Sequence, residues 1–110
     1  MNIIGNIEGK NCIILDDMID TAGTICNAAN AIKAMGAKAV FAGATHAVLS
    51  GPACERLEAS AIEELVLLDT VTLPEDKKLE KMTFLSVAPL FAEAISRVFS
   101  NGTVSELFDK

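Results

Sequence analysis

Residues 12–24 read CIILDDMIDTAGT, and this stretch decides the fold of the chain. Its first part belongs to a short apolar run, residues 11–15, of the kind found in strands that are covered on both faces. The run ends at two acids, Asp16 and Asp17, and after a turn-like segment apolar residues recur at helical spacing between residues 25 and 35. The stretch therefore predicts a buried strand, a loop and an amphipathic helix.

The same alternation of strand and helix continues to the end of the chain. Further apolar runs predict strands at residues 39–44, 65–68 and 83–85. The last predicted helix carries an apolar stripe at Leu90, Phe91, Ala94, Ile95 and Val98. We expect the three helices to begin at Thr24 (as N-cap), Pro52 and Ser86, and to end at Gly36, Ala59 and Asn101-Gly102.

Strands and helices that alternate at this spacing are joined by right-handed crossovers and form a parallel sheet. With 110 residues the chain has the length of one domain, which we place over residues 1–110. The prediction is an α/β fold whose sheet carries helices on both faces, a three-layer sandwich.

The composition excludes several classes of protein. No apolar run approaches the roughly 20 residues that span a bilayer, and the N-terminus lacks the features of a signal peptide, so we expect a cytoplasmic protein without membrane contact. The net charge of -6 argues against nucleic-acid binding, which depends on Lys and Arg. The three cysteines, Cys12, Cys26 and Cys54, form no C-x-x-C pair and are interpreted as reduced core thiols.

The loop after the first strand has the properties of an anion site. Ligands of open α/β sheets bind beyond the carboxyl ends of the strands, which is where this loop lies. Ala22 and Gly23 let a ligand approach the backbone, while the following helix directs its free N–H groups at the loop. Thr21 and Thr24 add hydroxyl groups.

The acids of the same loop suggest what else the ligand carries. Carboxylates repel a phosphate unless they face another part of the ligand, and Asp16 and Asp17 suit vicinal hydroxyls or a nearby magnesium ion. A sugar phosphate meets both requirements. The chain has neither G-x-x-x-x-G-K-[ST] nor G-x-G-x-x-G, so P-loop and dinucleotide sites are excluded.

The run from Leu15 to Ile25, LDDMIDTAGTI, closely resembles the ribose-phosphate motif of the phosphoribosyltransferase fold. Four further segments resemble the C-terminal half of the ribose-phosphate pyrophosphokinases, the PRPP synthetases. They are Ala44-Thr45-His46, Ser50-Gly51-Pro52, Asp69-Thr70-Val71-Thr72-Leu73-Pro74 and Leu90-Phe91-Ala92-Glu93-Ala94-Ile95.

That resemblance implies a phosphoribosyltransferase-like sandwich and a kinase-type transferase of nucleotide biosynthesis. The family transfers the pyrophosphoryl group of ATP to the anomeric hydroxyl of ribose 5-phosphate with Mg²⁺, and forms PRPP. By the resemblance, Asp16 and Asp17 hold the ribose hydroxyls. The 5-phosphate lies in the loop of Asp20, Thr21, Ala22, Gly23 and Thr24.

Other parts of the family's machinery have no counterpart in this sequence. The family's catalytic Lys and Arg would lie upstream of Met1, and its ATP-binding half is absent. We therefore expect these 110 residues to be inactive alone, without a catalytic residue or a certain metal ligand, and the complete enzyme to be a homo-oligomer. The resemblance also points to a regulatory site at Thr103, Val104, Ser105 and Phe108, where a capped turn, Thr103-x-x-Glu106, is the plainer interpretation.

Three alternatives remain at this point. A base phosphoribosyltransferase shares the loop motif, and a non-catalytic homologue that regulates PRPP synthetase would keep the whole segment. A phosphorylation-dependent response regulator is also a small parallel α/β domain, with Asp69 as its phosphoacceptor, but the required Lys after residues 83–85 is missing. His46 follows the second predicted strand and is interpreted as a loop residue rather than an acid-base group.

Overall fold

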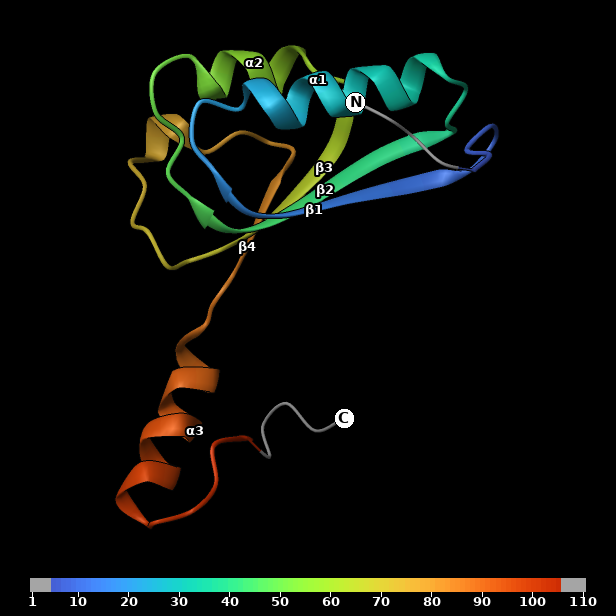
Figure 1. Cartoon of the computed structure of the whole chain (residues 1–110). Coiled ribbons are helices and arrows are strands. Elements are labelled where there is room, and N and C mark those ends of the chain that lie inside the picture. Colours follow the sequence, from blue (N-terminus) through green and yellow to red (C-terminus); the bar gives the residue numbers. More distant parts are fainter. Residues whose placement is uncertain (1–4, 106–110) are drawn as a thin grey trace.

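The structure is a computed structural model of the chain that describes residues 5–105. Its centre is a parallel sheet in the order β1-β2-β3-β4 (Figure 1). The strands are β1 (Asn11–Ile19), β2 (Ala39–Ala47), β3 (Ile62–Leu68) and β4 (Met82–Leu85). The helices are α1 (Gly23–Ala34), α2 (Ala53–Ala59) and α3 (Ala88–Phe99), with a 3₁₀ turn η1 (Glu75–Lys77). The predicted α/β class and parallel sheet are confirmed.

Helices α1 and α2 lie on the same face of the sheet (Figure 1). Each successive strand is added on the same side of the previous one, so the order never reverses. Right-handed crossovers that all move in one direction place their helices on one face. Within residues 5–105 the other face has no helix packed on it, so the prediction of two covered faces is met on one face only.

The core lies between that face and the two helices. In β3, Leu65 and Leu67 are fully buried while Val66 between them is 36% exposed. Leu57 of α2 and Ile25 of α1 pack into the same cluster from the helix side of the sheet. This period-two pattern is that of a sheet covered on one side.

Strand β1 differs most from its prediction. Cys12 and Ile14 pack against the core, whereas Ile13 is 70% and Leu15 80% exposed on the opposite face. The prediction that this strand is buried on both faces was wrong. An uninterrupted run of apolar residues does not show that alternate side chains are buried and exposed. The strand also continues through Asp16 and Asp17 rather than ending there.

The ends of α1 rest on backbone conformation more than on side chains. The N-cap is Ala22, in the left-handed region with φ 67°, and it makes no side-chain cap hydrogen bond. Thr24, the predicted N-cap, is an exposed residue inside the first turn. At the other end Gly36 has φ 99° and donates its N–H to the Lys33 carbonyl, as predicted, but Met35 is 49% exposed rather than part of the buried stripe.

Helix α3 extends away from the sheet (Figure 1). Its predicted apolar stripe exists, but none of the helix's residues is buried. The Ser86 hydroxyl accepts the Ala88 N–H at 3.1 Å, so Ser86 helps to start the helix although Val87 is the cap residue. Gly102 donates to the Arg97 carbonyl at 2.7 Å and ends the helix as predicted. No helix among residues 5–105 is long and apolar enough to cross a membrane.

Candidate functional site

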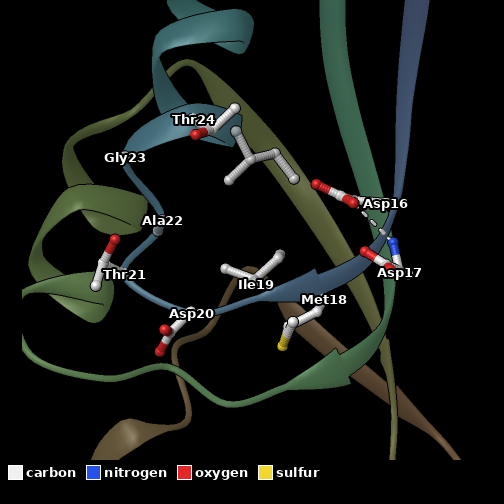
Figure 2. Close-up of a pocket in the computed structure, with 10 residues that line it drawn as sticks. Asp16, Asp17, Met18, Ile19, Asp20, Thr21, Ala22, Gly23 and Thr24 are labelled. Carbon is white, nitrogen blue, oxygen red and sulfur yellow. Dashed lines mark hydrogen bonds between the residues drawn. The ribbon is translucent and has the colours of Figure 1, made fainter.

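The loop after β1 forms a cavity of about 250 Å³ at the carboxyl end of the strand (Figure 2). Strand β1 pairs with β2 as far as Ile19, and α1 begins at Gly23, so the connection itself is only three residues long. The cavity is lined by residues 16–25. It brings together all seven predicted site residues: Asp16, Asp17, Asp20, Thr21, Ala22, Gly23 and Thr24.

Free backbone donors line one side of the cavity. The first hydrogen bond of α1 runs from the Cys26 N–H to the Ala22 carbonyl at 3.1 Å. The preceding N–H groups, of Gly23, Thr24 and Ile25, have no acceptor one turn earlier, as at any helix start. The left-handed Ala22 turns the chain so that these donors and the positive end of the helix dipole serve the cavity.

The acids lie on the strand side of the same cavity. Asp16 and Asp17 are exposed, and one Asp16 carboxylate oxygen accepts the Asp17 N–H at 2.8 Å. In Figure 2 the Asp16 side chain points toward the first turn of α1. The cavity thus offers acceptors at one end and donors at the other, which suits a ligand with hydroxyls at one end and an anion at the other.

The neighbouring loop after β2 holds this connection in place. The N–H groups of Val48 and Leu49 both donate to the Ile19 carbonyl at 3.0 Å. The Ser50 N–H donates to the Asp20 carbonyl at 2.8 Å. These bonds place the predicted Ser50-Gly51-Pro52 turn directly beside the candidate site, so the turn supports the loop as well as leading into α2.

One contributor to the site was missed by the sequence analysis. The side chain of Arg56, in α2, donates from Nη1 to the Thr21 carbonyl at 3.2 Å. The sequence suggests a loop without a cation because the neighbouring Lys10, Lys33 and Lys38 lie outside it. The available signal was topological: α2 follows the next parallel strand, so its first turn lies at the same edge of the sheet.

His46 does not line the cavity. It lies within β2 rather than after it, opposite Met18 of β1. Its Nδ1 lies 2.7 Å from the Thr70 hydroxyl, which itself donates to the Thr45 carbonyl at 3.1 Å. Because the hydroxyl hydrogen is used there, Nδ1 carries the proton that it donates to Thr70. His46 thus joins the ends of two neighbouring strands.

The three cysteines are free thiols. Burial raises the pKa of the Cys26 thiol, outweighing the opposite effects of the Ser60 hydroxyl and of Lys81 and Arg56. A raised pKa keeps the thiol protonated and unreactive. The structure therefore supports a packing role for Cys26, while Cys12 and Cys54 are only half-buried.

Three of the residues predicted to be regulatory, Thr103, Val104 and Ser105, lie beyond the end of α3, away from the cavity (Figure 1). Arg97 donates from Nη1 to the Thr103 carbonyl at 3.0 Å. Thr103, Val104 and Ser105 are thus placed by the end of the helix. Phe108, like Glu106 of the predicted capping box, lies outside the residues that the structure describes.

Comparison with known proteins gives one consistent picture. The family model described as "Phosphoribosyl synthetase-associated domain" matches residues 1–109. The ribose-phosphate pyrophosphokinase of Clostridium perfringens is 60% identical over 108 residues, which are 98% of this chain and 34% of that protein. The ribose-phosphate pyrophosphokinase of Halalkalibacterium halodurans is 61% identical over 109 residues, 99% of this chain and 34% of that protein.

A solved structure agrees with these relatives. The crystal structure of phosphoribosylpyrophosphate synthetase from Mycobacterium smegmatis superposes with a TM-score of 0.87 at 47% identity, over 90% of this chain and 33% of that one. This chain spans about a third of the length of the relatives that it matches. The chain was predicted to make up one half of the enzyme, and this predicted share was therefore too large.

Proposed function

This chain belongs to the phosphoribosyl synthetase family, and on that premise we propose that it supplies the ribose 5-phosphate site of a ribose-phosphate pyrophosphokinase. The supporting observation is the cavity after β1, where free N–H groups of α1 and the carboxylates of β1 face one small volume. Within the family we assign the chain to the C-terminal part of the enzyme, following the motifs from Leu15 to Ile25 and from Asp69 to Pro74.

In the proposed mechanism this chain binds and orients the sugar. The N–H groups of Gly23 and Thr24, with the Thr24 hydroxyl, hold the 5-phosphate. Asp16 and Asp17 accept hydrogen bonds from the ribose hydroxyls and so fix the anomeric carbon relative to the incoming pyrophosphoryl group. Phosphoryl transfer depends mainly on positioning and charge stabilisation, so this orientation is the chain's contribution to the rate.

The Mg²⁺ expected for the complete enzyme fits this cavity only in part. Residues 5–105 contain no group of three His, Cys, Asp or Glu side chains that could hold a metal ion. Mg²⁺ is, however, commonly held by one or two carboxylates together with substrate oxygens. Asp16 and Asp17 provide such carboxylates, and the ion would supply charge neutralisation at the transferred group.

ATP would bind through parts of the enzyme outside this chain, as would the catalytic Lys and Arg. We expect the complete enzyme to be a cytoplasmic homo-oligomer with no nucleic-acid partner, in keeping with the net charge of -6. The 110 residues alone should form no PRPP from ATP and ribose 5-phosphate. A direct assay of PRPP formation checks this, and measurable turnover would contradict it.

The test of the sugar site is Asp17→Asn. Removing the charge of an acceptor that pairs with a ribose hydroxyl costs about 1.5–3 kcal/mol, so ribose 5-phosphate affinity should fall roughly tenfold or more. Titration calorimetry on the folded variant measures this. Asp76→Asn removes the same charge from an exposed residue of η1 and should leave the affinity unchanged.

Unchanged affinity in Asp17→Asn would show that Asp17 does not contact the ribose hydroxyls. Binding of ribose 5-phosphate without turnover by the complete polypeptide would favour the non-catalytic homologue. A response regulator finds no support, because the Asp69 carboxylate already accepts the Val87 N–H at 2.8 Å.

A further inference from the structure

Arg56 contacts the loop of the candidate site at the Thr21 carbonyl but does not line the site cavity itself. It lines a second cavity, of about 340 Å³, together with residues of α1 that include Cys26, Asn27 and Asn30. Gly23 lines both this cavity and the site cavity. The two cavities therefore adjoin at Gly23.

The contact between Arg56 and the loop is close enough to favour glycine at position 23. A Cβ added to Gly23 would lie 3.2 Å from Nη1 of Arg56, closer than ordinary van der Waals contact. The φ angle of Gly23 is not in the left-handed region, so conformation does not demand glycine here. The missing side chain leaves room for the guanidinium group beside the Thr21 carbonyl.

The backbone of Arg56 is held in place within α2. The neighbouring helical positions Ala53 and Leu57 are both fully buried, and the Arg56 N–H donates to the Pro52 carbonyl at 3.0 Å. The backbone that carries the guanidinium group is thus anchored in the core although the side chain itself is exposed. An anchored donor can impose an orientation on the loop.

Because of the geometry of the peptide bond, this contact also fixes the direction of a backbone N–H at the site. The bond between Thr21 and Ala22 is planar and trans, so its C=O and N–H point in opposite directions. The Thr21 carbonyl points toward Arg56, which lines the second cavity. The Ala22 N–H then points the other way, and Ala22 lines the site cavity.

We propose that Arg56 is a positioning residue that fixes the Thr21–Ala22 peptide so that the Ala22 N–H serves as a donor to the 5-phosphate. The charge on Arg56 also polarises this peptide and strengthens its N–H as a donor. In this inference the identity of the ligand rests on the proposed function, whereas the orientation of the peptide is independent of that function.

The first test needs no ligand. In Arg56→Gln the loop should loosen, so the Cys26 amide, which closes the first turn of α1 on the Ala22 carbonyl, should exchange its hydrogen at least about fivefold faster in NMR measurements. Arg56→Lys, which keeps a charged donor, should give an intermediate rate. Lys38→Gln removes the same charge from an exposed residue before β2 and should leave the rate unchanged.

The second test measures ribose 5-phosphate affinity in the same variants. Arg56→Gln should weaken binding about fivefold or more, Arg56→Lys should restore part of the loss, and the midpoint of thermal unfolding should stay the same in both. A lowered midpoint with unchanged loop exchange would indicate a general structural role and overturn the inference.

The two tests separate the inference from the proposed function. If the unaltered chain does not bind ribose 5-phosphate, the proposed site fails, and the exchange measurement alone decides whether Arg56 orients the loop. If the chain binds but Arg56→Gln binds equally well with unchanged exchange, the inference is wrong and the proposed function stands.

Discussion

The carboxylate of Asp69 illustrates how a single residue can link two elements. At the end of β3 it accepts the backbone N–H of Val87, just before α3, and the Ser86 hydroxyl adds a second interaction. These donors, the Val87 N–H first, hold the pKa of the Asp69 carboxyl below its ordinary value of 3.8. The ionised form is therefore favoured in the folded chain.

A depressed carboxyl pKa has a defined consequence for pH. The contact contributes to stability above the pKa of the unfolded chain and is lost as the pH falls through the folded value, here below 3.8. NMR titration of the Asp69 carboxyl should give a midpoint below 3.8. Val87→Pro, which removes the donated N–H, should move the midpoint upward, and Val87→Ala should not. Equal midpoints in the two variants would mean that the Val87 N–H is not the cause.

The candidate site residues between Asp16 and Thr24 were predicted from the sequence, whereas Arg56 was not. The acids and T-A-G-T form one continuous stretch, so their proximity follows from the chain itself. Arg56 is 35 positions beyond Thr21, and only the packing of α2 beside the loop makes them neighbours.

At the scale of elements, helix ends were predicted best where the backbone itself demands a residue type. Gly36 lies in the left-handed region and ends α1, and Asn101, with φ 58°, precedes the Gly102 that ends α3. The start of α1 was placed less well because an N-cap is usually inferred from a side-chain acceptor. Ala22 has none and depends instead on the hydrogen bonds that hold the preceding loop.

Gly36→Ala tests the end of α1. The φ of 99° is strained for alanine, and the added Cβ would lie 3.0 Å from Cγ of Glu8. We expect the free energy of unfolding to fall by at least about 1 kcal/mol in urea denaturation. Gly102→Ala is the matched control, because its Cβ would make only ordinary contacts of 3.5 Å or more and its φ is not left-handed. A loss of the same size in both would mean that backbone strain at Gly36 is not responsible.

At the scale of the whole molecule, one face of the sheet is buried and the other is largely exposed. One face packs under α1 and α2, while the other leaves apolar side chains such as Ile13, Leu15 and Leu85 half or more exposed. The exposed residues of α3, among them Phe91 and Phe99, add to this apolar surface. The hydrophobic contribution to folding within this chain therefore comes from one face.

Two leucine substitutions compare the faces directly. Leu65→Ala empties a fully buried position and should lower the free energy of unfolding by about 2–5 kcal/mol. Leu15→Ala changes a residue that is 80% exposed and should cost less than about 0.5 kcal/mol. Denaturant titration of both variants checks this. A large loss in Leu15→Ala would show that the second face is covered in solution.

The amino-acid sequence was enough to predict the α/β class, the approximate positions of four strands and three helices, and the loop from Asp16 to Thr24. This is so because hydrophobic period, glycine conformation and neighbouring polar groups are local properties of the chain. Three features became visible in the folded chain alone: which face of β1 is buried, the separation of α3 from the sheet, and the contact of Arg56 with Thr21. These depend on strand order and on contacts between distant segments, which local patterns do not encode.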